Sequence, residues 1–327
     1  MTVLTQDPST QVASNSAGPT LGRLVNGELL KLRTTSLWWI LGLCALVATV
    51  LALLLNGFLA HDEIFQAKHP PDFAQEFFGG QVPSQQELAD AEANWRADHV
   101  LSDILVRSAA NIFTSGQFFG LMIVMLFGAL MVTNEYHHQT ATTTFLGAPR
   151  RERVIAAKVA AAAIVAAIVW LVTTVLDLGV GTIFFSTEHE SNSLDVSTVQ
   201  RAIGMNLPAY MLWALLGLGL GALIRHQIAS TLIGTGLYLI GGQIAQLIFI
   251  LVYTLWIKAD WVMQAMVALP AMASTVMISA NRVAVWTTED GSAIYAPPWW
   301  VGALVLIGYG IIATGIGTLF IRKRDIS

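Results

Sequence analysis

Residues 155–185 read IAAKVAAAAIVAAIVWLVTTVLDLGVGTIFF, and this apolar run carries only two charged side chains, Lys158 and Asp177. A helix rises about 1.5 Å per residue, so a run of this length exceeds the roughly 30 Å hydrocarbon core of a bilayer. A helix that is apolar all round needs an apolar environment on every side. The run therefore predicts a helix that spans a membrane.

The composition of all 327 residues supports the same class of protein. Hydrophobic residues make up 55% and charged residues 12%, and the mean hydropathy is +0.63. Soluble domains carry about 25% charged residues, so this chain has too few to cover a water-facing surface. A soluble enzyme, a disordered chain and a disulfide scaffold are excluded, the last because Cys44 is the single cysteine. The formal charge of −4 argues against nucleic acid as a partner, which normally binds a basic surface.

Five further stretches reach the length of about 20 apolar residues that a membrane-spanning helix requires. They are Leu37–Ala60, Asn111–Thr133, Ile203–Ile224, Ile228–Trp256 and Trp299–Ile321. Another apolar stretch, Trp261–Ala280, contains Pro270 in its middle, and a proline interrupts the hydrogen bonds of a helix. We therefore expect an all-α polytopic membrane protein with six spans and a re-entrant or interfacial helical pair before the last one.

The basic residues predict how the spans are oriented. With the N-terminus in the cytoplasm, the cytoplasmic segments hold 11 of the 17 basic residues. These are Arg23, Lys31, Arg33, Arg150, Arg151, Arg153, Lys158, Arg225, Arg322, Lys323 and Arg324. Basic residues concentrate on the cytoplasmic side of membrane proteins. We expect a multi-pass protein of the cell membrane with both termini in the cytoplasm.

The N-terminal region divides into two parts. Residues 1–20 have no apolar pattern and are expected to form a disordered cytoplasmic tail, ahead of a transmembrane domain at 21–327. Within Leu21–Ser36, apolar residues recur at helical spacing while Arg23 and Lys31 line another face. This pattern is typical of an amphipathic helix that lies in the membrane interface. Ordinary juxtamembrane anchoring is the alternative.

The first outer loop, His61–Ala110, is long and acidic. Within it, Ser84 and Glu87 have the spacing of a capping box, in which each side chain bonds the other residue's backbone amide at a helix start. The helix that begins here is expected to run directly into the second span. The loop either gates an outer exit or is a solvated connection between two spans.

The longest cytoplasmic loop, Asn134–Arg153, reads NEYHHQTATTTFLGAPRRER. Gly147 and Pro149 bracket a turn, and Thr140–Leu146 has room for a helix of two turns. The loop is too short for a catalytic domain, but a short helix that projects from a membrane domain can dock another protein. A plain loop with basic anchoring residues is the alternative.

Short patterns in and around this loop resemble those of one transporter family. The first patch consists of Glu135, Thr140, Thr144-Phe145-Leu146, Ala148-Pro149-Arg150-Arg151 and Lys158. Glu28, Lys31 and Arg33 form a second patch with the spacing Glu-x-x-Lys-x-Arg. Together with six spans and a proline-bearing pair before the last one, these patches resemble the permeases of bacterial ATP-binding-cassette transporters of the type 2 exporter class. The long acidic outer loop departs from the shortest members of that class.

The resemblance implies a permease that pairs with an identical or a different permease copy. It also implies two copies of a separate nucleotide-binding ATPase subunit, which would hold ATP and Mg²⁺. The coupling helix of the family maps onto about Gln139–Leu146, and the elbow residues Glu28, Lys31 and Arg33 would help to seat the ATPase. The expected ATPase-coupling residues are Glu135, Thr140, Thr144, Phe145, Leu146, Arg150 and Arg151.

No chemistry is expected from this chain itself. The sequence has no GxxxxGK[ST] phosphate loop and no HExxH, CxxC or GxSxG motif. We therefore expect no catalytic, cofactor-binding or metal-binding residue and no enzymatic activity in this subunit.

A few polar or small residues inside apolar segments are candidates for a role in transport or packing. Gln243 and Gln246 share a face of the fifth span, where they either bond across a helix interface or line a substrate path. Pro270 belongs to the expected outer gate of that path. Asp177 falls near the outer end of its span, so a hydrated carboxylate at the membrane rim is expected there rather than a proton path. Gly217 and Gly221 form a small-xxx-small pair that lets two helices approach closely.

The function expected from these observations is export. The chain would be the membrane-spanning subunit of an exporter, as in multidrug efflux, that moves a hydrophobic or amphipathic drug, lipid or peptide with ATP hydrolysed by its partner. A secondary transporter or channel and a non-transporting membrane sensor are the alternatives, and membrane lipid surrounds the protein in each.

Overall fold

The computed structural model describes residues 20–79, 83–137, 151–288 and 291–323. Six helical segments in these ranges are long and apolar enough to span a membrane. They are α2 (Leu37–Lys68), α5 (Leu101–Phe113) with α6 (Gln117–His137), α8 (Arg151–Thr187), α9 (Ser197–Ile224), α10 (Gln227–Gly236) through α11 (Gly242–Leu255), and α14 (Trp299–Lys323). The prediction of an all-α protein with six spans is confirmed.

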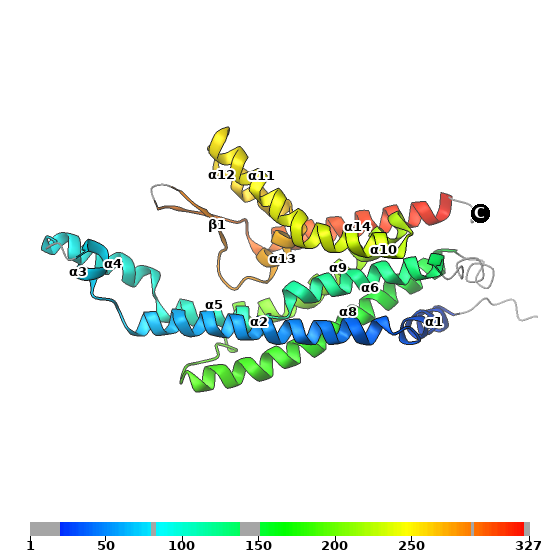
Figure 1. Ribbon diagram of the computed structural model, residues 1–327, viewed down its shortest axis with the longest axis horizontal. Coiled ribbons are helices and arrows are strands. Elements are labelled where there is room, and N and C mark those ends of the chain that lie inside the picture. Colours follow the sequence, from blue (N-terminus) through cyan, green and yellow to red (C-terminus); the bar gives the residue numbers. More distant parts are fainter. Residues whose placement is uncertain (1–19, 80–82, 138–150, 289–290, 324–327) are drawn as a thin grey trace, which may run out of the picture.

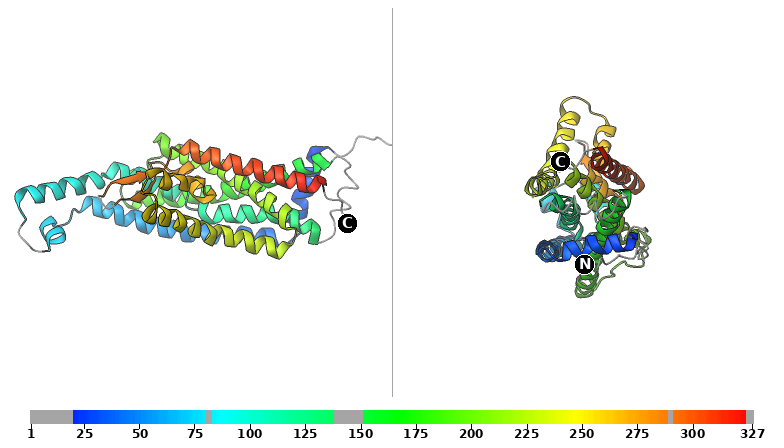
Figure 2. Two further views of the ribbon diagram at one scale, coloured as in Figure 1. Left: turned by 90° about the horizontal axis from the view of Figure 1, so that it is seen from above. Right: turned by 90° about the vertical axis from the view of Figure 1, so that its right-hand side faces the viewer.

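The spans form one elongated bundle (Figures 1 and 2). The N-terminal helix α1 (Leu21–Arg33), the inner end of α6 and the end of α14 lie together at one end of it. Two outer helices, α3 (Phe73–Phe78) and α4 (Gln85–Asp98), project from the opposite end. Three of the segments that the basic residues place on one side of the membrane therefore lie at the same end of the bundle.

The helix α6 forms the centre of the bundle. Of an 18-residue apolar stretch in the second span, 83% is buried inside the protein, whereas only 6% of the corresponding stretch of the fifth span, α10–α11, is buried. α9 packs along α6, and Gly217 and Gly221 of α9 face the backbone of Met125 and Ala129. A methyl group on either glycine would collide with that backbone, so the predicted close approach at this pair is confirmed.

The second span is interrupted at residues 114–116, between α5 and α6. The hydroxyls of Thr114 and Ser115 donate back to the carbonyls of Ala110 and Asn111, at 2.7 and 3.0 Å, and so satisfy the last acceptors of α5. The chain also leaves the helical conformation between α4 and α5, at His99 and Val100. The helix that begins at Gln85 does lead into the span, because Gln85–His137 forms one candidate span of 53 residues, but it is interrupted at 99–100 and at 114–116.

The side chain of Asp177, on α8, binds to the interruption at 114–116. Its Oδ2 accepts a hydrogen bond of 3.2 Å from the backbone N–H of Gly116, which has no partner within a helix. Only 1% of Asp177 is exposed, and Tyr210 donates to the Gly116 carbonyl at 2.9 Å on the other side. The expected hydrated rim carboxylate is wrong, because a backbone amide 61 positions away in the chain binds Asp177 inside the bundle.

The apolar segment before the last span is a bent helix pair. The helical turns α12 (Asp260–Gln264) and η2 (Ala265–Ala268) meet α13 (Pro270–Ile278) at 95°, which is the geometry of a broken span or a re-entrant loop. Pro270 starts α13, where its missing N–H costs nothing. On its inner side, α13 is tied to the bundle by a 2.7 Å hydrogen bond from the Trp213 indole to Ser274. The predicted helical pair is confirmed.

A two-stranded antiparallel hairpin follows this pair and has no counterpart in the sequence-based predictions. It joins β1 (Ala284–Thr287) to β2 (Ala293–Tyr295), with Trp286 opposite Ile294. Ile294 is buried against Val262 and Met263 of α12. The hairpin therefore covers the bent pair.

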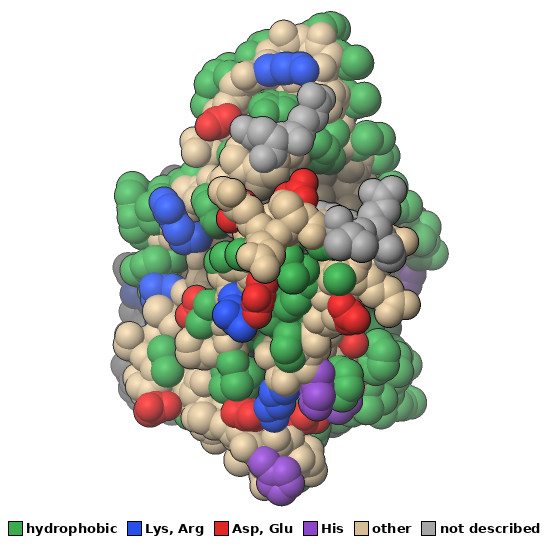
Figure 3. All heavy atoms as spheres, turned by 90° about the vertical axis from the view of Figure 1, so that its left-hand side faces the viewer, with side chains coloured by type: hydrophobic (Ala, Val, Ile, Leu, Met, Phe, Trp, Pro, Cys, Tyr) green, Lys and Arg blue, Asp and Glu red, His purple; other side chains and the backbone are tan. Residues whose placement is uncertain are grey.

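The outer helix α4 begins as the sequence predicts. The Glu87 amide donates to Ser84 Oγ at 3.3 Å, and the Ser84 amide donates to Glu87 Oε2 at 2.8 Å, which confirms the capping box. These hydrogen bonds lower the pKa of the exposed Glu87 carboxyl below its usual 4.5. No residue of α4 is buried, so this helix is solvated along its whole length. Figure 3 shows charged side chains of both signs distributed over this end of the molecule.

Candidate functional site

The candidate site lies where α1 crosses the end of the bundle. α1 is oriented across the spans rather than along them, as both views in Figure 2 show. Its apolar and polar residues occupy different faces, and it packs mainly against α8 while burying Glu28 and Leu32. The amphipathic elbow helix expected from the sequence is therefore present. A buried glutamate on such a helix needs a partner of opposite charge.

Glu28 belongs to an ion cluster of four side chains, Glu28, Lys31, Glu135 and Lys158. Lys158 Nζ lies 2.7 Å from Glu28 Oε2 and 2.8 Å from Glu135 Oε1. Lys31 Nζ lies 2.8 Å from Glu28 Oε1 and 2.6 Å from Glu135 Oε1. Each carboxylate thus contacts both ammonium groups, and the four charges alternate in sign around a closed ring.

Burial makes the ion cluster different from an ordinary surface salt bridge. The side chains of Lys158, Glu28 and Glu135 are 5%, 6% and 7% exposed. Lys158 also donates to the Met131 carbonyl at 3.2 Å, so a backbone acceptor of α6 joins the network. Removing one member of a buried cluster leaves an uncompensated charge, which costs much more than losing an exposed pair.

Lys31 is the member that reaches water, with 43% of its side chain exposed. Burial acts to lower the pKa of Lys31, but the hydrogen bonds and charges of Glu135 and Glu28 together outweigh it. The pKa of Lys31 is raised above its usual 10.5 as a result. The ammonium form is the one that the ion cluster stabilises.

The ion cluster joins three elements that are far apart in the sequence. Glu28 and Lys31 come from α1, Glu135 from the last turn and a half of α6, and Lys158 from the second turn of α8. α6 ends and α8 begins on either side of residues 138–150. The cluster therefore connects α1 to both ends of the loop that the sequence singles out.

Three of the predicted elbow and coupling residues meet in this cluster, namely Glu28, Lys31 and Glu135. Arg33, the third elbow residue, is not among them. Thr140, Thr144, Phe145, Leu146 and Arg150 lie outside the described residues, as does the predicted coupling helix at 139–146. Arg151 is the first residue of α8.

Lys158 is the functional residue that the sequence analysis did not single out. The sequence predicts a cytoplasmic basic residue within the first patch, whereas the structure shows the most buried cation of the ion cluster. The available signal was its position as the lone cation in an apolar run, since an ammonium group in such a run needs a carboxylate partner.

The predicted pathway residues lie elsewhere. Gln243 and Gln246 are on α11, where Gln243 is exposed and Gln246 half-buried, and Pro270 is half-buried at the start of α13. A π-helical turn, η1 (Leu237–Gly241), directly precedes α11. These residues belong to a different part of the bundle from the ion cluster. Among the described residues, no three His, Cys, Asp or Glu side chains gather in a way that would hold a metal ion.

Comparison with known proteins identifies the family. Residues 97–327, well over half of the chain, match the model of a family described as "Protein of unknown function (DUF2705)". The chain belongs to the DUF2705 family. The sequence matches no curated protein. In this DUF2705 protein, Glu135 and Lys158 fall within the matched region, whereas Glu28 and Lys31 of α1 precede it.

Proposed function

We propose that this multi-span membrane protein is the permease subunit of an ATP-binding-cassette exporter of the type 2 class. Support comes from the six candidate spans, the bent helix pair before the last one and the elbow helix α1. Each of these features is part of the resemblance to that class. In this proposal both termini face the cytoplasm of a cell-membrane protein.

The observation that carries the proposal is the buried ion cluster. It connects α1 to α6 and α8 on both sides of the loop at 138–150. An ATPase that binds this loop and α1 would therefore displace α6, the most buried candidate span of the described chain. A displacement applied at the surface would reach the centre of the bundle without any chemistry in this chain.

The proposal needs partners that supply the energy and complete the pathway. Two ATPase subunits would bind ATP and Mg²⁺, and a second permease, identical or different, would cover a face of this one. The fifth span, with Gln243 exposed on it, is the least buried of the candidate spans and is our choice for that contact. The apolar character of the spans favours a hydrophobic or amphipathic cargo.

The first test is whether a neighbouring gene encodes a phosphate-loop ATPase, and the second is whether that ATPase associates and couples with this protein. The two proteins are co-expressed, and vanadate-sensitive ATP hydrolysis is measured with and without the permease. We expect co-purification and a permease-dependent change in rate. Phe145→Asp, or reversal of both Arg150 and Arg151 to Glu, should abolish that change, while the control Arg96→Glu on the outer helix α4, at the opposite end of the bundle, should retain it. Failure to co-purify, or full coupling in both variants, contradicts the proposal.

One observation favours a second candidate, a secondary transporter. An acidic side chain buried inside a membrane domain is a common part of ion and proton paths, and Asp177 is such a side chain. Vesicles that contain this chain alone distinguish the two functions. Proton flux that needs no ATP, resists vanadate and is lost in Asp177→Asn would favour the secondary transporter.

A further inference from the structure

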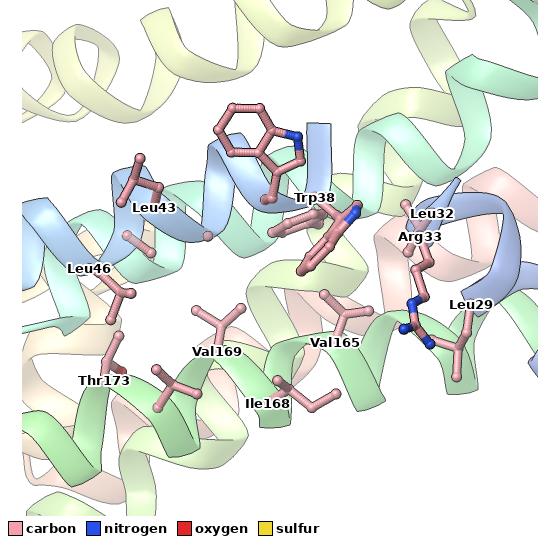
Figure 4. A pocket seen from close by; sticks show the side chains of 15 residues that line it. Leu29, Leu32, Arg33, Trp38, Leu43, Leu46, Val165, Ile168, Val169 and Thr173 are labelled. Carbon is pink, nitrogen blue, oxygen red and sulfur yellow. The ribbon is translucent and has the colours of Figure 1, made fainter. Parts of the chain in front are cut away.

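An apolar groove lies on the flank of the bundle between α2 and α8. Its volume is about 630 Å³, within the range of roughly 300–1,000 Å³ that small-molecule sites occupy. Figure 4 shows Trp38, Leu43 and Leu46 of α2 facing Val165, Ile168 and Val169 of α8 across it. Residues of α1 line one end, so the groove and the ion cluster share that helix.

The groove has the length of one membrane leaflet. On α2 it extends from Trp38 to Leu46, and on α8 from Val165 to Thr173. Eight residues of helix correspond to about 12 Å, while half of the hydrocarbon core is about 15 Å. The groove begins at the α1 end, so it lies in the leaflet next to α1. An occupant matched to it is a molecule of a single leaflet.

The α1 end of the groove carries a cation. The guanidinium of Arg33 lies there, beside Leu29 (Figure 4). Lys31, two positions earlier, faces the carboxylates of the ion cluster, but Arg33 forms no ion pair with any residue in the described ranges. A guanidinium presents a planar fork of donors that matches a phosphate group.

Trp38 and Trp39 line the groove at the same end. Tryptophan is enriched at membrane interfaces, where its ring contacts acyl chains and its N–H contacts the polar headgroup region. The groove thus changes from a cation to indole rings to aliphatic side chains along its length. That order complements an anionic phospholipid, whose negatively charged phosphate is followed by a polar interfacial region and then by acyl chains.

We infer that this groove binds one anionic phospholipid of the leaflet next to α1, with the phosphate against Arg33 and an acyl chain between α2 and α8. The inference rests on the groove and on Arg33 alone. It therefore stands independently of the proposed export function, because a bound lipid is equally compatible with the other functions considered.

The chain offers two matched pairs of variants for the test. Arg33→Gln removes the proposed phosphate contact, and Arg23→Gln removes another exposed cation of the same helix that does not line the groove. Gly42 lines the groove, and a Cβ added to it would meet no atom within 4 Å, so Gly42→Leu places a side chain in the groove from an unobstructed position. Gly179 of α8 is also open but lies outside the groove, which makes Gly179→Leu its control.

The experiment counts bound lipid by native mass spectrometry. Full-length protein is reconstituted in an equimolar mixture of phosphatidylglycerol and phosphatidylcholine with the same acyl chains, and then extracted in detergent. We expect one retained phosphatidylglycerol per chain. Arg33→Gln should lower its retention about tenfold, as expected for loss of a charge-assisted contact. Gly42→Leu should remove the retained phosphatidylglycerol without phosphatidylcholine taking its place, and both controls should behave like the natural protein.

Three results would overturn the inference. Equal losses in Arg33→Gln and Arg23→Gln would show a general effect of positive charge near the membrane. Unchanged lipid retention in Gly42→Leu would show that lipid binds outside the groove. A change from a two-chain to a one-chain mass in Gly42→Leu would show that a second copy of the chain occupies it. Thermal unfolding midpoints equal to those of the controls establish that the variants are folded.

Discussion

The two ends of the bundle both hold ion pairs between a basic residue and glutamate, but in opposite environments. At the α1 end, Lys158 is enclosed with two carboxylates at 5% exposure. At the outer end, Arg107 pairs with Glu63 at 3.0 Å while both side chains remain about half exposed, at 48% and 43%. Water and salt screen the outer pair, but they do not reach the buried one. Burial, rather than the number of ion pairs, therefore decides which end depends on its charges.

The largest expected effect in this comparison is that of Lys158→Met. The substitution keeps the volume of the side chain but leaves Glu28 and Glu135 with only the half-exposed Lys31 between them. We expect a loss of about 3–5 kcal/mol in the free energy of unfolding. The measurement is chemical unfolding in detergent micelles.

Arg96→Ala is the matched control at the outer end, where Arg96 pairs with Glu92 on the solvated helix α4. Its loss should stay below about 1 kcal/mol. Similar losses in the two variants would mean that burial does not distinguish the two ends.

The next effect concerns Asp177, which lies between the two ends. Asp177→Ala removes the acceptor of the Gly116 amide inside the bundle, and an unsatisfied buried donor costs about 1–3 kcal/mol. Asp177→Asn retains a side-chain oxygen at the same place, so most of the stability should be kept. The same unfolding measurement tests both variants. Equal losses would show that the charge of Asp177, not its acceptor, stabilises the interruption.

Lys31 allows the ion cluster to be tested by pH, because it belongs to the cluster but its side chain reaches water. Its pKa is raised in the folded protein, so its stabilising contribution is complete below the usual value of 10.5 and is lost as pH rises through the higher folded value. Lys31→Met should therefore be less stable than the natural protein near neutral pH. The difference should shrink above pH 10.5, as measured by unfolding midpoints across an alkaline series. A difference that stays constant with pH would show that the charge of Lys31 contributes nothing.

The smallest effect is expected at the outer end, in the capping box of α4. The pKa of Glu87 is lowered, so its contribution is present above the usual value of 4.5 and is lost as pH falls through the lower folded value. Ser84→Ala should speed hydrogen exchange of the first amides of α4 at neutral pH, with no change at the α1 end. In the natural protein, acid should have the same local effect. Exchange that accelerates along every span would contradict a local role.

Features carried by local patterns were predictable from the sequence. Unbroken apolar runs predicted the number of spans, Pro270 predicted the bent pair, and Ser84 with Glu87 predicted the start of α4. Each of these signals involves residues that are neighbours in the chain. The hairpin at residues 284–295 was missed because its strands are only four and three residues long and contain no alternating pattern of useful length.

Features that depend on distant partners were not predictable in the same way. The interruption at 114–116 lies in an apolar run, and Asp177, whose carboxylate satisfies it, follows 61 residues later. The separation between Lys158 and Glu28 is 130 residues. The resemblance to a known family pointed to Glu28, Lys31 and Glu135 individually, but their convergence on Lys158 required the fold.

The interruption of the second span at 114–116 separates two helices, α5 and α6, that pack against different neighbours. A continuous helix carries a tilt along its whole length, whereas a few residues at a helix end can absorb a change in backbone angle. Here α5 packs mainly against α2, and α6 packs mainly against α9. The two halves of this span are therefore held by different neighbours, and the interruption at 114–116, which Asp177 and Tyr210 bind, is the point where their paths separate.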